Sequence, residues 1–182
     1  DHKGENNLLH WYLQHGQFSP DSRVLLMSAF GFDLSQKNIF ASLLSGAQLW
    51  LNNSQHYDSG ALSQLIATEN ITHINCAPSA FYPLVEDHPL DALQSLQFLM
   101  LGGEAIASKR IAPWFNQSQC RLFNHYGPSE CTDIALYHEM QKPLSASAAL
   151  PLGKPNPGVQ VYLINDNQQL MPEGLILSLI HI

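Results

Sequence analysis

The chain has 182 residues, 45% of them hydrophobic, which is enough for a domain with a hydrophobic core. Lysine and arginine together number 8 and the net charge is -7, which excludes a basic surface of the kind that binds nucleic acid. No apolar run approaches the ~20 residues that span a bilayer, and Cys76, Cys120 and Cys131 lack the paired spacing of a zinc site. We therefore expect a cytoplasmic protein with reduced thiols and no membrane partner.

The hydrophobic pattern predicts that helices and strands alternate along the chain. An apolar stripe that starts at Leu8 suits a first helix ending near His15, and Gly46 is expected to end the second helix. Alternation of this kind predicts an α/β fold with a largely parallel sheet, in which ligands bind at the carboxyl ends of the strands. The expected strands are residues 23–28, 47–51, 72–76, 96–101, 121–124, 135–139 and 160–164, and the later helices are residues 39–44, 60–68, 79–86 and 106–115.

Chemically distinctive residues follow several of these strands. In the stretch 122–132 (LFNHYGPSECT), Tyr126 has a face suited to a purine, Ser129 can donate to a phosphate and Glu130 offers oxygen ligands to a divalent cation. Gly127 and Pro128 would let the backbone approach a ligand. An ordinary turn with a buried tyrosine is the alternative, and residue types alone give the two interpretations equal weight.

Other strand ends allow both a functional and a structural interpretation. Gly102 to Glu104 would place free backbone amides at the start of a helix, or form a common glycine turn. Asp33 suits a helix N-cap, and it also suits a charge-assisted hydrogen bond to an ammonium group. His73 lies within an apolar strand and is expected to be a satisfied core histidine, whereas His125 adjoins the glycine turn.

Taken in order, these motifs resemble the amino-acid-activating adenylation domains of nonribosomal peptide synthetases. Those domains belong to the adenylate-forming superfamily, which includes acyl-CoA synthetases and luciferases. The resemblance covers residues 1–174. Residues 32–35 (FDLS) match an aromatic-Asp-x-Ser motif, and residues 124–130 (NHYGPSE) match Asn-x-Tyr-Gly-Pro-Thr-Glu with serine in place of threonine. Residues 102–104 resemble the loop beside the adenine, residues 151–155 (PLGKP) the Ile-Gly-Arg/Lys-Pro segment, and residues 2–4 the segment after the family's phosphate loop.

The resemblance implies the large N-terminal subdomain of an enzyme that joins an α-amino acid to ATP. The products would be an aminoacyl adenylate and pyrophosphate, and the aminoacyl group would pass to the phosphopantetheine thiol of a peptidyl carrier domain, in a synthetase that also has condensation domains. Ser129 and Glu130 would be catalytic, with Glu130 holding Mg²⁺ and Tyr126 stacking on adenine. The implied nucleotide-binding residues are Gly102, Gly103, Glu104, Asn124, His125, Tyr126, Gly127 and Ser129.

The same resemblance implies an amino-acid pocket in which Asp33 holds the substrate's ammonium group. An acyl- or aryl-acid-CoA ligase has no ammonium to neutralise, so Asp33 argues against that alternative; a non-catalytic nucleotide-binding module is a further one. A polar lining suggests a polar or charged substrate side chain, although Lys37 and Asp133 could satisfy each other and leave room for a neutral one. The implied pocket residues are Asp33, Leu34, Lys37, Asn75, Met100, Gly102, His125, Asp133 and Ile134.

The chain also departs from the family pattern. The family's upstream phosphate loop, its downstream ribose-binding aspartate and its C-terminal subdomain with the catalytic lysine have no match, so we expect a fragment that is inactive alone and exposes apolar strand edges. Residues 175–182 do not match either. Residues 177–182 (LSLIHI) are what CTGTCTCTTATACACATC encodes, a transposon end used in sequencing libraries. A sequencing artefact and a genuine apolar strand are the two interpretations of this tail.

Overall fold

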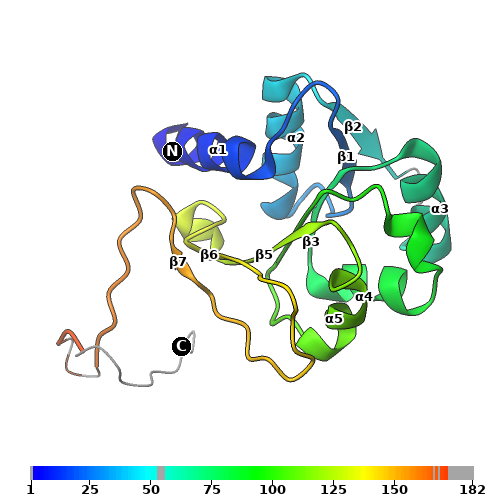
Figure 1. The fold of residues 1–182 in the computed structure, drawn as a ribbon. Helices are drawn as coiled ribbons and strands as arrows, with labels where there is room; N and C mark the ends of the chain where they lie inside the picture. Colours follow the sequence, from blue (N-terminus) through cyan, green and yellow to red (C-terminus); the bar gives the residue numbers. More distant parts are fainter. Residues whose placement is uncertain (1, 53–55, 166, 168, 172–182) are drawn as a thin grey trace.

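The protein forms one mixed sheet of seven strands in the order β2-β1-β3-β4-β5-β6-β7 (Figure 1). The computed structural model describes residues 2–52, 56–165, 167 and 169–171, so the tail at 175–182 lies outside the described residues. Strands β1 to β5 pair in parallel, and β6 and β7 are antiparallel to their neighbours. The expectation of an α/β fold with a largely parallel sheet is confirmed. The strands are β1 (Arg23–Leu26), β2 (Gln48–Leu51), β3 (His73–Cys76), β4 (Phe98–Gly102), β5 (Arg121–Tyr126), β6 (Leu136–Glu139) and β7 (Lys154–Pro155).

Helices cover both faces of the sheet, and the alternation of side chains along β4 shows why. Phe98 and Met100 point into a core formed with α1 and α2, whereas Leu99 and Leu101 point into a larger core formed with α3, α4 and α5. Figure 1 shows the two groups of helices on opposite sides of the strands. The helices are α1 (His2–Gly16), α2 (Leu34–Ser45), α3 (Ser59–Glu69), α4 (Pro78–Glu86) and α5 (Ser108–Phe115), with short 3-10 turns η1 (Leu90–Leu93) and η2 (Ser129–Cys131).

Some helix ends follow from local chemistry. Gly46 adopts φ +74° after α2, so it ends that helix as expected. The carboxylate of Asp58 accepts a hydrogen bond from Ala61 N at the start of α3 (3.0 Å).

His73 is a satisfied core histidine as expected, because its ring nitrogens lie 2.6 Å from Thr72 Oγ1 and 2.8 Å from Gly16 O.

Several expected boundaries are wrong. Helix α2 begins at Leu34 rather than at residue 39, because Asp33 caps it there. Helix α5 begins at Ser108 rather than at residue 106, so of the two interpretations of Gly102 to Glu104 the structure favours the glycine turn. Residues 160–164 form no strand; Ile164 makes only an isolated bridge to Leu170, and the apolar side chains of this segment remain exposed. Within the described residues, no helix is both long and apolar enough to cross a membrane.

Candidate active site at the carboxyl edge of the sheet

Asp33 joins the start of α2 to the turn after β5. Its Oδ1 accepts a hydrogen bond from Leu34 N (2.8 Å), which confirms the N-cap interpretation. Its Oδ2 accepts a hydrogen bond from the Ser129 hydroxyl, on η2. The loop before α2 is fixed by Ser35, whose hydroxyl donates to Phe32 O (2.7 Å) and Phe30 O (3.1 Å). The two motifs that were most distinctive in the sequence are therefore in direct contact.

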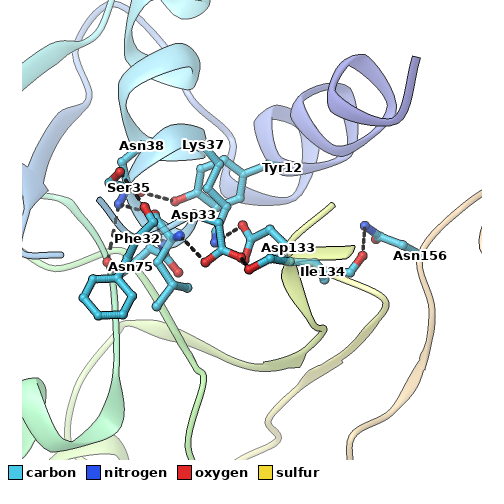
Figure 2. A network of polar contacts seen from close by, with 12 residues as sticks. Tyr12, Phe32, Asp33, Ser35, Lys37, Asn38, Asn75, Asp133, Ile134 and Asn156 are labelled. Atoms are coloured by element: carbon cyan, nitrogen blue, oxygen red, sulfur yellow. Dashed lines mark hydrogen bonds and ion pairs between the residues drawn. The ribbon is translucent and has the colours of Figure 1, made fainter. Parts of the chain in front are cut away.

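Lys37 and Asp133 form a buried ion pair next to Asp33 (Figure 2). Lys37 is 0% exposed, and its ammonium donates to Asp133 Oδ2. Burial lowers the pKa of Lys37 and raises the pKa of Asp133, and the charge of the partner opposes both shifts. These two residues satisfy each other, which was the second of the two possibilities that the sequence left open.

Uncharged side chains also hold helix α2 in place through hydrogen bonds to α1 and β3. The Tyr12 hydroxyl, on α1, donates to Asn38 Oδ1 (2.9 Å), and Asn75 Nδ2 donates to Leu34 O (2.9 Å). Asn38 Nδ2 also reaches Asn75 O (3.4 Å), so α1, α2 and β3 are linked in one chain of contacts (Figure 2). Burial raises the pKa of Tyr12 well above its ordinary value, so this hydroxyl remains a donor.

Among the described residues, His125, near the end of β5, stands out because neither nitrogen of its buried ring has a partner. The residue is 3% exposed, yet neither ring nitrogen has a hydrogen-bond partner. Its ring lies directly over Gly102, where an added Cβ would be 2.2 Å from His125 Nε2. Burial, with a smaller contribution from the charge of Lys37, lowers the pKa of His125 well below its ordinary value, so the ring is neutral.

Two cavities open at this edge, and Gly103, Glu104 and His125 line both of them. We call them the Asp33 cavity, of about 380 Å³, and the Tyr126 cavity, of about 440 Å³. Both volumes fall within the range of small-molecule sites. The Asp33 cavity is also lined by Met27, Phe32, Asp33, Leu34, Cys76, Ala80, Gly127 and Asp133, and the Tyr126 cavity by Ile106, Asn124, Tyr126, Ala149, Leu150 and Leu152.

The glycine-rich turns have structural roles that the sequence did not predict. Glu104 binds the start of α4, since Ser79 N and Ser79 Oγ donate to its two oxygens (3.1 and 2.8 Å). The missing side chain of Gly127 makes room for the protein's own backbone, because an added Cβ would lie 2.2 Å from Asp133 O. Asn124 Nδ2 donates to Pro151 O (2.9 Å) and so connects β5 to the segment before β7.

The predicted site residues fall into two groups. Asp33, Leu34, His125 and Asp133 line the Asp33 cavity, whereas Gly102, under His125, lines neither cavity. Four other predicted pocket residues are buried behind the lining: Lys37, Asn75, Met100 and Ile134. Of the predicted nucleotide residues, Asn124 and Tyr126 line the Tyr126 cavity. Ser129 and Glu130 do not line it; both are exposed on η2, which follows Tyr126 closely in the sequence.

Sequence reasoning missed several residues of this region. Glu5, on α1, has a buried Oε1 without a partner, and burial followed by the charge of Asp133 raises its pKa. Asn156 is buried and donates to Ile134 O (3.3 Å). Met27, Cys76 and Ala80 line the Asp33 cavity. The sequence could have indicated two of these cavity residues, because Met27 directly follows β1 and Cys76 is the last residue of β3. It offered no such signal for Ala80.

Comparison with known proteins agrees with this architecture. The family model described as AMP-binding enzyme matches residues 4–176. Tyrocidine synthase 3 of Brevibacillus parabrevis is 31% identical over 175 residues, which cover 96% of this chain but 3% of that protein. The chain thus spans a small fraction of the length of such relatives.

Solved structures share the fold. FmoA3, a nonribosomal peptide synthetase, has a TM-score of 0.85 at 21% identity, with 94% of this chain and 19% of that chain covered; its AMPPNP-bound form has a TM-score of 0.84. Holo-PA1221, an NRPS protein containing adenylation and PCP domains, has a TM-score of 0.76 at 29% identity, with 86% of this chain and 27% of that chain covered. On the match over residues 4–176, the chain belongs to the AMP-binding enzyme family.

Proposed function

We propose that this chain contains the amino-acid pocket and the adenine side of the nucleotide site of an adenylation domain in a nonribosomal peptide synthetase. The domain would activate an α-amino acid with ATP. The observation that supports this most directly is that two adjacent cavities at one sheet edge share Gly103, Glu104 and His125, with Asp33 in the lining of one and Tyr126 in the lining of the other. A reaction between an amino acid and a nucleotide needs two such neighbouring spaces.

In the proposed reaction, a carboxylate oxygen of the amino acid attacks the α-phosphorus of ATP. The new bond between oxygen and phosphorus forms as the bond to the bridging oxygen of pyrophosphate breaks, so that the aminoacyl adenylate and pyrophosphate result. Asp33 would accept hydrogen bonds from the α-ammonium group and fix its position. Ser129 would leave Asp33 and donate to an oxygen of the α-phosphate.

The nucleotide would bind in the Tyr126 cavity. The apolar lining residues Ile106 and Leu150 suit a base, and the ring of Tyr126 offers it a face. Glu130 has an exposed carboxylate, which fits Mg²⁺, because that ion commonly takes one or two protein carboxylates and completes its coordination with phosphates and water. Bound there, Mg²⁺ would neutralise phosphate charge. The aminoacyl group would then pass to the phosphopantetheine thiol of a carrier domain.

Exchange of labelled pyrophosphate into ATP tests this proposal on the polypeptide as its gene encodes it. Exchange should require an α-amino acid, and acids of equal size without the ammonium group should not replace it. Equal exchange with such acids would support an acyl- or aryl-acid ligase instead. Binding of a fluorescent ATP analogue without any exchange would support a nucleotide-binding module.

Substitutions of Asp33 separate its two roles. Asp33→Asn keeps the helix cap but removes the charge, so the KM for the amino acid should rise about 10- to 100-fold while the unfolding midpoint changes little. Asp33→Ala should raise that KM similarly and also destabilise the protein by about 1 kcal/mol. Asp58→Asn, at the equivalent cap of α3, is the matched control and should change neither. An unchanged KM in Asp33→Asn would contradict the assigned role.

A further inference from the structure

The loop after β4 lies between the two cavities of the proposed site. We call residues 103–107 the dividing loop; Gly103 and Glu104 line both cavities, and Ile106 lines the Tyr126 cavity. Gly103 adopts φ +82°, a conformation that glycine adopts without strain. Because glycine also permits many other conformations, Gly103 does not fix the direction of the loop. Contacts farther along the loop must set it.

Helix α4 makes two such contacts. Ser79 N and Ser79 Oγ donate to the two carboxylate oxygens of Glu104 (3.1 and 2.8 Å). The backbone N–H of Ala107 donates to the Tyr82 hydroxyl (2.7 Å). The dividing loop is therefore tied to α4 both near its start and at its end.

Helix α4 is a firm support for the loop because it is fixed in the larger core, where Phe81 and Leu84 are fully buried. The start of the helix depends on the loop in return. Ala77, at the N-cap, has no side chain that can accept a hydrogen bond from the first turn, so the carboxylate of Glu104 supplies the acceptor. Its negative charge also suits the positive end of the helix dipole.

The opposite wall of the Tyr126 cavity is held separately. Most of residues 148–152 line that cavity, and none of them lines the Asp33 cavity. The hydroxyl of Ser108, the first residue of α5, lies 2.9 Å from both Ala146 O and Ala148 O and so holds this wall. Substitutions can therefore loosen the two walls one at a time.

We propose that Ser79 and Tyr82 are positioning residues for both substrates, because they hold the dividing loop in the form that lines the amino-acid and nucleotide cavities together. This inference rests on the proposed function. Ser79→Ala removes one of the two hydrogen bonds to Glu104, and Tyr82→Phe leaves Ala107 N without its acceptor. Binding of either substrate must then first restore the loop, so both KM values should rise about 3- to 10-fold.

Pyrophosphate exchange, measured against ATP and against the amino acid, tests the inference on the polypeptide as its gene encodes it. Ser79→Ala and Tyr82→Phe should each raise both KM values, and Ser79→Thr, which keeps the hydroxyl, should leave them near those of the unsubstituted protein. Ser108→Ala should raise the KM for ATP alone. Ser79 and Glu104 are exposed, so Ser79→Ala should hardly change the unfolding midpoint. A KM value does not depend on the amount of folded protein.

Ser59→Ala is the comparison at another helix start. Ser59 is the first residue of α3, its hydroxyl lies 2.9 Å from His88 Nε2, and it lines neither cavity, so its loss should change neither KM. Unchanged KM values in Ser79→Ala, or a rise for one substrate only, would overturn the inference.

Absence of exchange with any α-amino acid in the unsubstituted protein would instead contradict the proposed function. Binding of the fluorescent ATP analogue would then still test the dividing loop. Its dissociation constant should rise in Ser79→Ala and stay the same in Ser59→Ala, and equal values in the two variants would count against the loop's role.

Discussion

Lys37 is a fully buried lysine with one carboxylate as its ionic partner. Removing a charge from water is costly, and the attraction between the two groups compensates only while both remain. The pair also explains why a pocket with a polar sequence has a mostly apolar lining, because Lys37 and Asp133 direct their charges toward each other rather than into the cavity.

A double-mutant cycle tests the pair. Asp133→Asn should lower the free energy of unfolding by about 3 kcal/mol, because it leaves the Lys37 ammonium buried without its counter-charge. Lys37→Met should cost a similar amount, and the double variant should lose at least about 1 kcal/mol less than the sum of the two. Urea denaturation of the chain measures all three. Strict additivity would show that the two side chains contribute independently.

For single residues, the sequence predicted local contacts better than contacts between distant segments. Asp33 was expected as a cap and is one, because the cap depends on neighbours in sequence. The pairing of Lys37 with Asp133 remained an open alternative, because it depends on two segments that the sheet brings together. Glu5 was missed, since α1 gives no local sign that Oε1 of its single carboxylate is buried near that pair.

The turn between β5 and β6 is the element that positions Asp133. Thr132 and Asp133 have φ values of +61° and +67°, which are unfavourable for residues with side chains. The turn is held in this form by close contact with Gly127, whose missing Cβ leaves room for Asp133 O and Ala135 N. The packing of Gly127 against this turn therefore also fixes the position of Asp133, which pairs with Lys37.

Gly127→Ala tests this packing. The added Cβ would lie 2.2 Å from Asp133 O, a backbone atom, so the turn must shift. We expect a loss of about 1–3 kcal/mol in the free energy of unfolding. Gly31→Ala is the matched control, because nothing lies within 4 Å of its added Cβ, and it should change stability by less than about 0.5 kcal/mol. Equal effects of the two substitutions would contradict the packing argument.

The hydrophobic pattern correctly distinguished most helices from strands. It failed for segments whose structure depends on whether they pack against the rest of the protein. The alternating residues 160–164 suggested a strand, yet their apolar side chains are exposed and pair with no neighbouring strand of the sheet. The glycine turn after β4 had two interpretations, a helix start or a common turn, and neither predicted that Glu104 binds the start of α4, which is distant in sequence. Neither outcome is visible in a local pattern.

For the whole molecule, the most exposed apolar surface of a helix lies on α2. Phe40, Leu43 and Leu44 are 45%, 72% and 64% exposed, and their spacing places them on one side of the helix. Contiguous apolar surface of this kind promotes association. The sequence led us to expect exposed apolar strand edges; Leu51, in the edge strand β2, is 59% exposed, and the α2 face adds apolar surface that was not predicted.

Replacing Leu43 and Leu44 together by glutamine should raise the monomeric fraction of the chain at least about twofold. Light scattering after size-exclusion chromatography measures that fraction. The control replaces Val161 and Leu163, which are exposed but lie in an irregular segment, and should have a smaller effect. An equal effect of both changes would show that total exposed apolar area matters rather than the α2 face.

The contacts Asp33–Ser129 and Lys37–Asp133 each join residues that are 96 positions apart. Closing a loop of that length costs about 4 kcal/mol of chain entropy in a simple polymer estimate. The two loops are almost the same loop, so the contact that forms first bears nearly all of this cost and the other forms without it. During folding, the hydrogen bond between Asp33 and Ser129 and the ion pair between Lys37 and Asp133 should therefore appear together, as one cooperative step.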